Sequence, residues 1–323
     1  MLDANLACSH SKQVRLHIDE ALYVLSRQYG RTLLLIDRFV GDTLASSIQT
    51  LTVASPKRLV LDDPLFENNP GMAPLLVELL HSEPTHHDLL RESVLVAQEE
   101  SREIFGAHSV CGWLFSGATL AQMRHALQLR LDVQYPSGER RYLRYFDPRV
   151  LPRMLALLAT EDNGNKPAPA GPGALLGPVR TWCHLDQNGR LLRHDNLEPY
   201  QRSSARMRFD ERTAGAVDRI EAINMTIRAL TRHAVCCDLP NNSVIDANLV
   251  AAQALGLAYN EDLVAYAWRA IFYGRPFAAN AILRELASKA TTNGIPFDAM
   301  VSESFPFPCL NISTAGFTAQ EAR

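Results

Sequence analysis

Several features that would place a protein outside the cytoplasm are missing. In 323 residues there is no run of about eighteen apolar residues, so we expect no membrane-spanning helix. The first thirty residues lack the long apolar stretch of a signal peptide. The six cysteines include no CxxC pair, and adjacent Cys236 and Cys237 fit neither zinc-ligand spacing nor a usual disulfide. We therefore expect a soluble protein in a reducing cytoplasm.

The common catalytic and phosphate-binding motifs are also missing. Neither a P-loop nor GxGxxG occurs, so the sequence predicts no nucleotide cofactor. Phe115–Ser116–Gly117 approaches a nucleophile elbow but lacks its leading glycine. Gly171–Pro172–Gly173 is predicted to precede a strand, where it would not cradle phosphate. We expect no cofactor and no enzymatic activity.

Four neighbouring side chains resemble a metal site: His81, His86, His87 and Asp88. Metal-binding histidine pairs on a helix usually lie four residues apart, whereas adjacent residues point about 100° apart. The sequence favours a polar helix start here over a metal site. The paired carboxylates Asp62 and Asp63 precede Pro64 and fit a turn.

The charge is unevenly distributed although the net charge is only −3. Residues 59–104 contain ten acidic and two basic side chains, and residues 105–160 contain seven basic and three acidic ones. Two solvated surfaces that partly neutralise each other would explain this, and so would a charged face that orients a partner. We expect no nucleic-acid partner.

The apolar pattern predicts alternating helices and strands in the first part of the chain. Helices are expected at Val14–Gln28, after a turn within Asn68–Leu80, from His86 to Glu103 with Thr85 as cap, at Ala118–Leu129, and from Pro148 to Ala159 with Asp147 as cap. Strands are expected at Thr32–Asp37, Lys57–Leu61 and His108–Ser116, and in two hairpins, Arg130–Tyr135 with Arg140–Tyr145 and Val179–Leu185 with Leu191–His194.

Beyond about Asp210 the apolar spacing becomes purely helical. The predicted fold class is α+β: a mixed α/β lobe over residues 1–195, with a loop or linker at 161–177, and a small all-helical lobe over 196–290. The tail, 291–323, is expected to be extended or partly disordered. Trp113, Trp182 and Trp268 lie in apolar runs and are expected in the core.

A basic stretch lies where the two predicted lobes join. Either it is the solvated start of a helix or it is a strip that docks a partner. Its members, our candidate partner-binding residues, are Arg202, Arg206, Arg208 and Arg212.

Three ordered segments resemble one known family: LLLIDRF and PGMAPLLVEL, then YLRYFDPRVLPRMLALL, then LGPVRTW. The resemblance covers roughly Leu33 to Leu192, and AIFYGRPF at Ala270–Phe277 is also similar to the end of longer members. This set is similar to that of the type VI secretion effector chaperones, or adaptors, first catalogued as a domain of unknown function. The family's pattern is RFYDPR, and this sequence has the two aromatic residues in the reverse order, as Tyr145 followed by Phe146. The motif residues are Arg144, Asp147, Pro148, Arg149, Gly177, Pro178 and Trp182.

The resemblance implies a cytoplasmic bacterial adaptor that binds one secreted toxic effector and helps load it onto the trimeric valine-glycine-repeat spike protein. It implies no catalytic residues. Asp147 is expected to cap a helix, and Arg144 or Arg149 to pair with a carboxylate, although Arg149 could instead contact a partner. A structural subunit of the secretion apparatus and, further away, a metal-dependent hydrolase using the histidines are the alternatives.

Overall fold

The chain forms two compact units, Met1–Ile220 and Glu221–Arg323, which we call the sheet unit and the helical unit. The predicted α+β fold class is confirmed. The computed structural model describes residues 17–41, 43–51, 56–102, 108–160, 171–197, 206–232 and 240–305.

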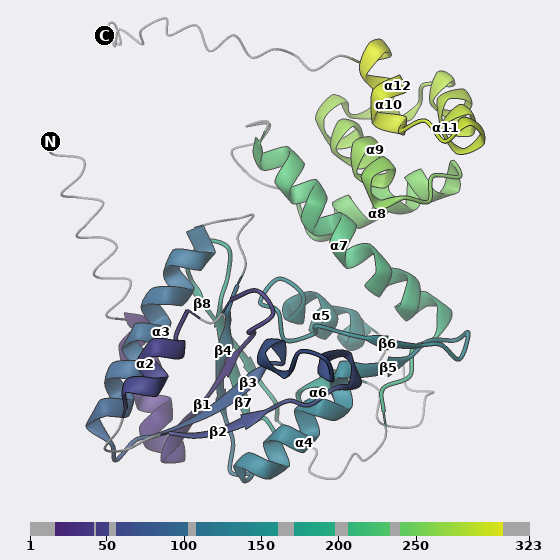
Figure 1. Cartoon of the computed structure of the whole chain (residues 1–323). Helices are drawn as coiled ribbons and strands as arrows, with labels where there is room; N and C mark the ends of the chain where they lie inside the picture. Colours follow the sequence, from purple (N-terminus) through teal and green to yellow (C-terminus); the bar gives the residue numbers. More distant parts are fainter. Residues whose placement is uncertain are drawn as a thin grey trace, which may run out of the picture. The chain divides into compact units, whose positions relative to one another are not determined.

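A six-stranded antiparallel sheet forms the centre of the sheet unit (Figure 1). Its strand order is β2-β3-β1-β4-β7-β8, so β2 and β8 are its edges. The strands are β1 (Arg31–Ile36), β2 (Lys57–Val60), β3 (Leu75–Leu80), β4 (Val110–Phe115), β7 (Thr181–Leu185) and β8 (Leu191–Asp195).

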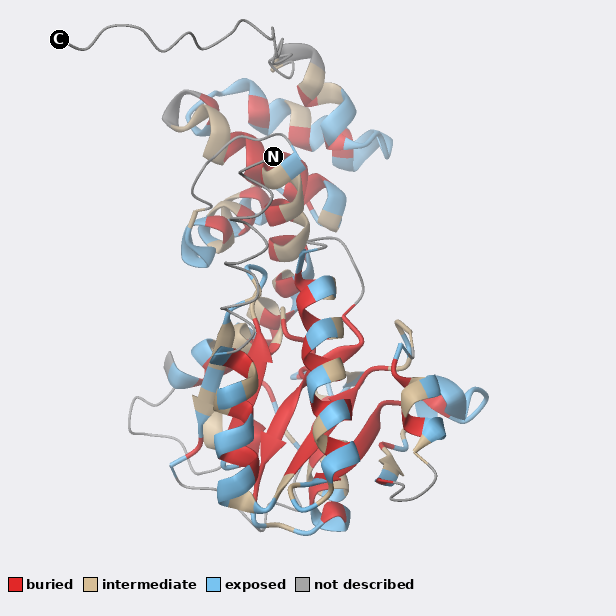
Figure 2. Ribbon diagram, turned by 90° about the vertical axis from the view of Figure 1, so that its left-hand side faces the viewer, coloured by how far each residue is buried: buried red, intermediate tan, exposed pale blue. Residues whose placement is uncertain are grey.

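Helices cover both faces of this sheet, and Figure 2 shows most of the sheet as buried. On one face lie the helix over residues 17–29, α2 (Ala45–Thr50) and α3 (Pro84–Arg102). On the other face lie α4 (Leu120–Leu131), α5 (Leu151–Thr160) and the short α6 (Pro172–Leu176).

Strand β1 is formed by a continuous apolar run because both faces of the sheet are covered at this strand. Leu33 and Leu35 belong to the core on the α4 side, and Leu34 and Ile36 to the core on the α3 side. Successive side chains of a strand point to opposite faces, so a sheet covered on both sides needs apolar residues at every position.

The helix predicted after the turn within Asn68–Leu80 is wrong. A short 3-10 helix, η2 (Pro70–Met72), is followed by strand β3, which pairs with β1 on one side and β2 on the other. Five of the six β3 residues are buried. A short run that is apolar on both faces has no periodicity to separate strand from helix, and its place between two strands decided the outcome.

Three further local predictions need correction. Helix α3 begins at Pro84, so Thr85 lies inside its first turn and not at the cap, since proline is well tolerated at the first helical position. Helix α5 begins at Leu151, because turns occupy residues 145–150. Within the predicted loop 161–177, residues 172–176 form helix α6. Gly171–Pro172–Gly173 therefore begins a helix and does not directly precede a strand. Residues 161–170 lie outside the described part of the chain.

The first predicted hairpin is confirmed, with β5 (Asp132–Gln134) paired to β6 (Arg140–Tyr142) and Gly138 in the turn at φ +84°. A third segment joins its other edge. Gln134 donates its N–H to the Met207 carbonyl at 2.9 Å, and Phe209 donates to the Gln134 carbonyl at 2.9 Å. Residues that the sequence assigned to the helical lobe therefore belong to the sheet unit.

Helix α7 (Glu211–Arg232) explains why the division differs from the predicted boundary after residue 195. Its first part packs into the core of the sheet unit through Ala214, Val217 and Ile220. From Ala222 onward its apolar residues belong to the core of the helical unit. One amphipathic helix thus serves two cores, which an apolar period cannot reveal.

The helical unit contains further helices, as predicted. These are α8 (Asn242–Ala254), α9 (Asn260–Tyr273), α10 (Arg275–Ala278), α11 (Ile282–Asn293) and α12 (Phe297–Ser304). None of the helices in the described parts of the chain is both long and apolar enough to cross a membrane.

Helix α12 corrects the prediction of an extended tail from residue 291. Phe297 and Val301 are fully buried in the helical core. Arg269 of α9, itself fully buried, donates to the Asp298 carboxylate at 2.6 Å and to the Ser302 hydroxyl at 2.7 Å. These bonds attach α12 to α9; residues 306–323 lie outside the described part of the chain.

Candidate functional site

The charged residues of the Arg144–Arg149 segment form one buried network with the end of β1. Arg144 donates to the carboxylate of Asp37, which directly follows β1, and its Nη2 lies 3.8 Å from Asp147 Oδ2. Arg149 binds the Asp147 carboxylate with two nitrogens, Nε to Oδ1 at 2.9 Å and Nη2 to Oδ2 at 2.7 Å. Asp37 and Asp147 are 1% and 4% exposed, so these pairs are largely shielded from water.

Asp147 also organises the chain between the hairpin and α5. Its Oδ1 accepts the Arg149 N–H at 2.9 Å, and its carbonyl accepts from Val150 at 2.8 Å and Leu151 at 2.9 Å. The prediction that Asp147 caps the helix is therefore wrong, because α5 begins only at Leu151. The Asp147 carboxylate instead accepts an N–H of the turn that precedes α5, and Pro148 lies in that turn and not in the helix. The prediction that Arg144 or Arg149 pairs with a carboxylate is confirmed, and both arginines do so.

The two carboxylates of this network respond differently to burial. Burial raises the pKa of Asp37 above its usual value, and Arg144 offsets only part of that rise. Burial also acts to raise the pKa of Asp147, but the hydrogen bonds and charge of Arg149 hold this pKa below its usual value. Asp147 is therefore the charged anchor of the network.

Two groups near this network could be mistaken for a nucleophile and its base. Burial raises the pKa of the Cys111 thiol well above its usual value, and burial lowers the pKa of His108. The Cys111 sulfur lies 3.9 Å from the His108 carbonyl oxygen and 3.7 Å from that of Ser109. The thiol is thus kept protonated and points at backbone acceptors.

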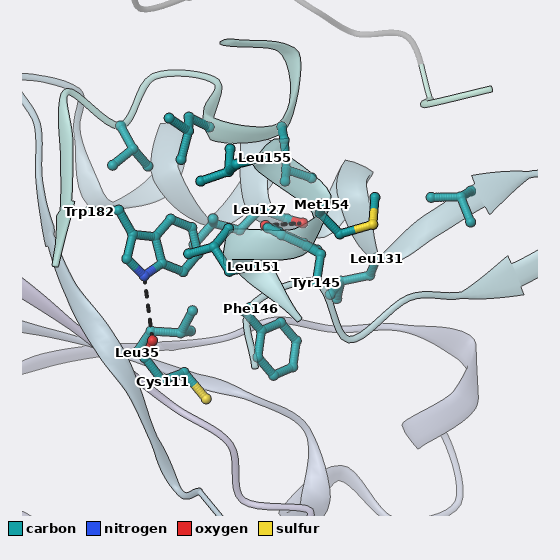
Figure 3. Packing of buried hydrophobic residues seen from close by; sticks show 14 of the residues in the cluster. Leu35, Cys111, Leu127, Leu131, Tyr145, Phe146, Leu151, Met154, Leu155 and Trp182 are labelled. Atoms are coloured by element: carbon teal, nitrogen blue, oxygen red, sulfur yellow. Dashed lines mark hydrogen bonds between the residues drawn. The ribbon is translucent and has the colours of Figure 1, made fainter. Parts of the chain in front are cut away.

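The second motif segment, Gly177, Pro178 and Trp182, packs beside the first. The Trp182 indole is fully buried, donates to the Cys111 carbonyl at 3.4 Å and lies 6.1 Å from the Tyr145 ring (Figure 3). Gly177 has φ +58°, and a Cβ there would lie 2.5 Å from Nη2 of the buried Arg130. The Pro178 carbonyl accepts from Ser116 Oγ at 2.6 Å. This segment therefore packs into the hydrophobic core next to the ion network and holds β4 and Tyr145 in place.

The histidine cluster is explained by local hydrogen bonds. Nδ1 of the buried His86 accepts the Leu80 N–H at 2.8 Å, and His87 Nε2 lies 2.7 Å from the His81 carbonyl oxygen. The rings of His81 and His87 pack against Tyr23 at 4.8 and 5.3 Å. Among the described residues, no group of three or more His, Cys, Asp or Glu side chains could hold a metal ion.

Two arginines of the arginine-rich stretch make contacts within the sheet unit. Arg206 pairs with Asp132 at 2.8 Å, and the backbone of Arg208 bridges to Gln134 beside β5. The side chains of Arg208 and Arg212 are exposed, and Arg202 lies outside the described residues. Arg206 is therefore paired within the sheet unit, and a partner-binding role for Arg208 and Arg212 stays a prediction.

Three exposed apolar residues that were not predicted from the sequence lie on the loops that follow β1 and β2. Phe39, Leu65 and Met72 are 54%, 59% and 39% exposed, and we call them the loop residues. Arg38 holds two of these loops together by donating to the carbonyls of Ala73 at 2.7 Å and Pro70 at 2.9 Å. The Arg144 guanidinium lies 5.7 Å from the centre of the Phe39 ring. Apolar residues on loops give no periodic signal, so only their exposure marks them.

The β7–β8 hairpin carries a histidine pair that predicts a pH-dependent stability. His184 is buried, and its Nε2 lies 3.0 Å from Nε2 of His194. Burial lowers the pKa of His184 to about 4 and also lowers the pKa of His194. The neutral form of His184 is favoured in the folded state, so its contribution is complete above about pH 6.5 and is lost as the pH falls through about 4.

We expect this loss to reach about 3 kcal/mol of unfolding free energy between pH 7 and pH 4. Urea unfolding at several pH values measures it, and the variant His184→Gln should show a correspondingly flatter pH dependence. His125→Gln, on the exposed surface of α4, serves as control and should follow the unmodified protein. Equal pH dependence in all three proteins would contradict the assignment.

Comparisons with known proteins give one match. No curated protein and no solved structure matches the chain. The matched region runs from within β1 to just past α5 and contains the whole Asp37–Arg149 network, whereas Gly177, Pro178, Trp182 and the helical unit lie outside it. Residues 33–163 of this chain match the model of a protein family described as Domain of unknown function (DUF4123).

Proposed function

We propose that this protein is a cytoplasmic adaptor that binds one type VI secretion effector and helps load it onto the trimeric valine-glycine-repeat spike protein. The observation that carries the proposal is where the Arg144–Arg149 motif lies and what its side chains contact. Arg144, Asp147 and Arg149 lie within the region that matches the family, and their charges are directed at partners inside the fold. Such a network fits a scaffold whose purpose is to hold binding surfaces in a fixed shape.

Exposed apolar side chains supply candidate contacts for a protein partner. The sheet unit presents the loop residues, beside a hollow of about 380 Å³ lined in part by Asp62, Asp63 and Glu67. Burial of apolar side chains supplies binding energy, and a charged rim orients the partner and excludes others.

We assign the effector to the helical unit, which presents its own exposed apolar residues. Those residues are Val244, Val250, Tyr259, Ile282 and Ile295. Deleting everything after Asp210 would be an unsuitable test, because Ala214, Val217 and Ile220 belong to the core of the sheet unit. Single substitutions on the surface of the helical unit test the assignment without opening either core.

The decisive experiment measures secretion. In a strain that lacks this protein, we expect one effector to disappear from the culture medium while the spike protein and other effectors are still exported, as measured by quantitative mass spectrometry. Loss of all export would instead indicate a structural subunit of the apparatus, and unchanged export would contradict both. One zinc ion bound per purified chain would favour a hydrolase.

Complementation then locates the surface. Tyr259 is 72% exposed, so Tyr259→Asp should fold normally yet reduce export of that effector by about tenfold or more, since a charge at the centre of an apolar contact is costly. Val24→Asp, a similar change at a 57% exposed site in the sheet unit, should restore full export. Equal behaviour of the two variants would refute the assignment to the helical unit.

A further inference from the structure

Among the described strands, the edge strand β2 has a partner on one side only, which is β3. It pairs with β3 in the register Lys57↔Glu78 to Val60↔Leu75, and Leu61 continues the ladder by donating to the Pro74 carbonyl at 2.8 Å. Hydrogen-bonded positions alternate in an antiparallel pair, so Lys57, Leu59 and Leu61 face β3. The N–H and C=O groups of Arg58 and Val60 therefore point outward, where the described residues include no further strand.

A groove of about 800 Å³ lies at the Lys57 end of β2, between this strand, β1 and the start of α4, and its charge is mainly positive. It is lined by Arg31, Lys57 and Arg58, by Glu78, and by Ser116 to Ala121 at the start of α4, among others. Arg31 pairs with Glu78 and also donates to the Ala118 carbonyl. Lys57 and Arg58 are exposed and have no ion-pair partner among the described residues, so two positive charges remain uncompensated at the edge.

From this combination we infer that β2 is a docking edge for an extended, acidic segment of a partner protein, which adds to the sheet as a seventh strand. Outward backbone groups supply the affinity of such strand addition, and neighbouring side chains supply its specificity. The inference does not depend on the proposed function, because any partner with a suitable segment would bind.

The side chains of β2 define what the segment should carry. Lys57 and Leu59 lie on the α4 side of the sheet, since they pair with Glu78 and Leu76, whereas Arg58 and Val60 lie on the α3 side. An incoming strand meets two basic residues at one end of β2 and two apolar residues at the other. It should therefore contain two adjacent acidic residues next to two adjacent apolar ones.

The test uses the full chain and synthetic peptides. A fluorescein-labelled peptide of sequence TTVVEETT, or the same peptide in reverse order, should bind, whereas TTVVKKTT should not. Fluorescence anisotropy measures affinity, and hydrogen exchange should show slower exchange of the Arg58 and Val60 amides in the complex. Binding of the acidic and basic peptides with equal affinity would overturn the inference.

Two variants separate strand addition from simple charge attraction. Val60→Pro removes an outward N–H and leaves the β2–β3 ladder intact, so it should weaken binding by about tenfold or more, whereas the similarly shaped Val60→Thr keeps the N–H and should bind. Lys57→Glu with Arg58→Glu should reverse the preference from acidic to basic peptide, and Arg91→Glu on the exposed surface of α3 should not. If Val60→Pro binds the acidic peptide as well as Val60→Thr does, the outward N–H of Val60 is not used and the inference fails. The basic residues would then serve only to prevent unwanted strand pairing at the edge of the sheet.

Discussion

Replacing Gly112 by alanine should destabilise the sheet unit by about 4 kcal/mol. Gly112 lies in β4 with φ +142°, and a Cβ there would lie 2.5 Å from the Cys183 carbonyl oxygen and 2.6 Å from Trp182 Nε1. One contact is with backbone and the other with a fully buried indole, so neither neighbour can move aside cheaply. The strands β4 and β7 would have to separate where the register of β4 on β1 is already irregular, after Leu35.

The measurement is urea unfolding followed by tryptophan fluorescence, which reports on Trp182 and Trp113 in the cores on the two faces of the sheet. Gly117→Ala is the matched control, because a Cβ at Gly117 would meet no atom within 4 Å. The control should change stability by less than about 0.5 kcal/mol. Similar stability losses in both variants would show that close approach of Trp182 is not the reason for glycine at position 112.

Asp147→Asn should cost about 3–5 kcal/mol, although it changes almost no volume. The amide cannot balance the charge of Arg149, whose side chain is 25% exposed and whose two hydrogen bonds to the buried Asp147 carboxylate are largely shielded from water. Glu139→Gln is the control: Glu139 pairs with Arg141 at 2.9 Å, but both side chains are about half exposed. Exposed pairs contribute little, so this control should lose less than about 1 kcal/mol.

The pH dependence of Asp147→Asn provides a second check. The pKa of Asp147 is lowered in the folded state, so its stabilising effect is complete above the usual carboxyl pKa and is lost as the pH falls through the lower, folded value. The unmodified protein should therefore approach the variant in stability only in strong acid. A constant difference between the two proteins down to about pH 2 would show that the carboxylate acts through shape and not through charge.

Local patterns were sufficient for most of the individual elements. The apolar run at β1, the hairpin with Gly138 in its turn, the second hairpin and the helices after Asp210 formed as expected. These depend on neighbours in sequence, on turn residues and on a period of two or about 3.6. The run at Leu75–Leu80 was misread because it carries no such period.

The ion network could be predicted only in part. The sequence indicated that Arg144 or Arg149 would pair with a carboxylate, and Asp147 lies two residues from Arg149. The second carboxylate, Asp37, lies far away in the sequence, directly after β1. Its partner is fixed by the position of the β6–α5 connection in the fold, and no spacing rule links residues so distant.

By itself, the sequence determined the fold class, the core positions of the three tryptophans and the family-like motif, because each depends on composition, short periods or a contiguous pattern. Only the tertiary structure decided the order of strands in the sheet, the division of the chain within α7 and the free edge of β2. These depend on which surfaces meet after folding. The free energy of burial is set by three-dimensional neighbours, and the same apolar residue can serve either unit until its neighbours are known.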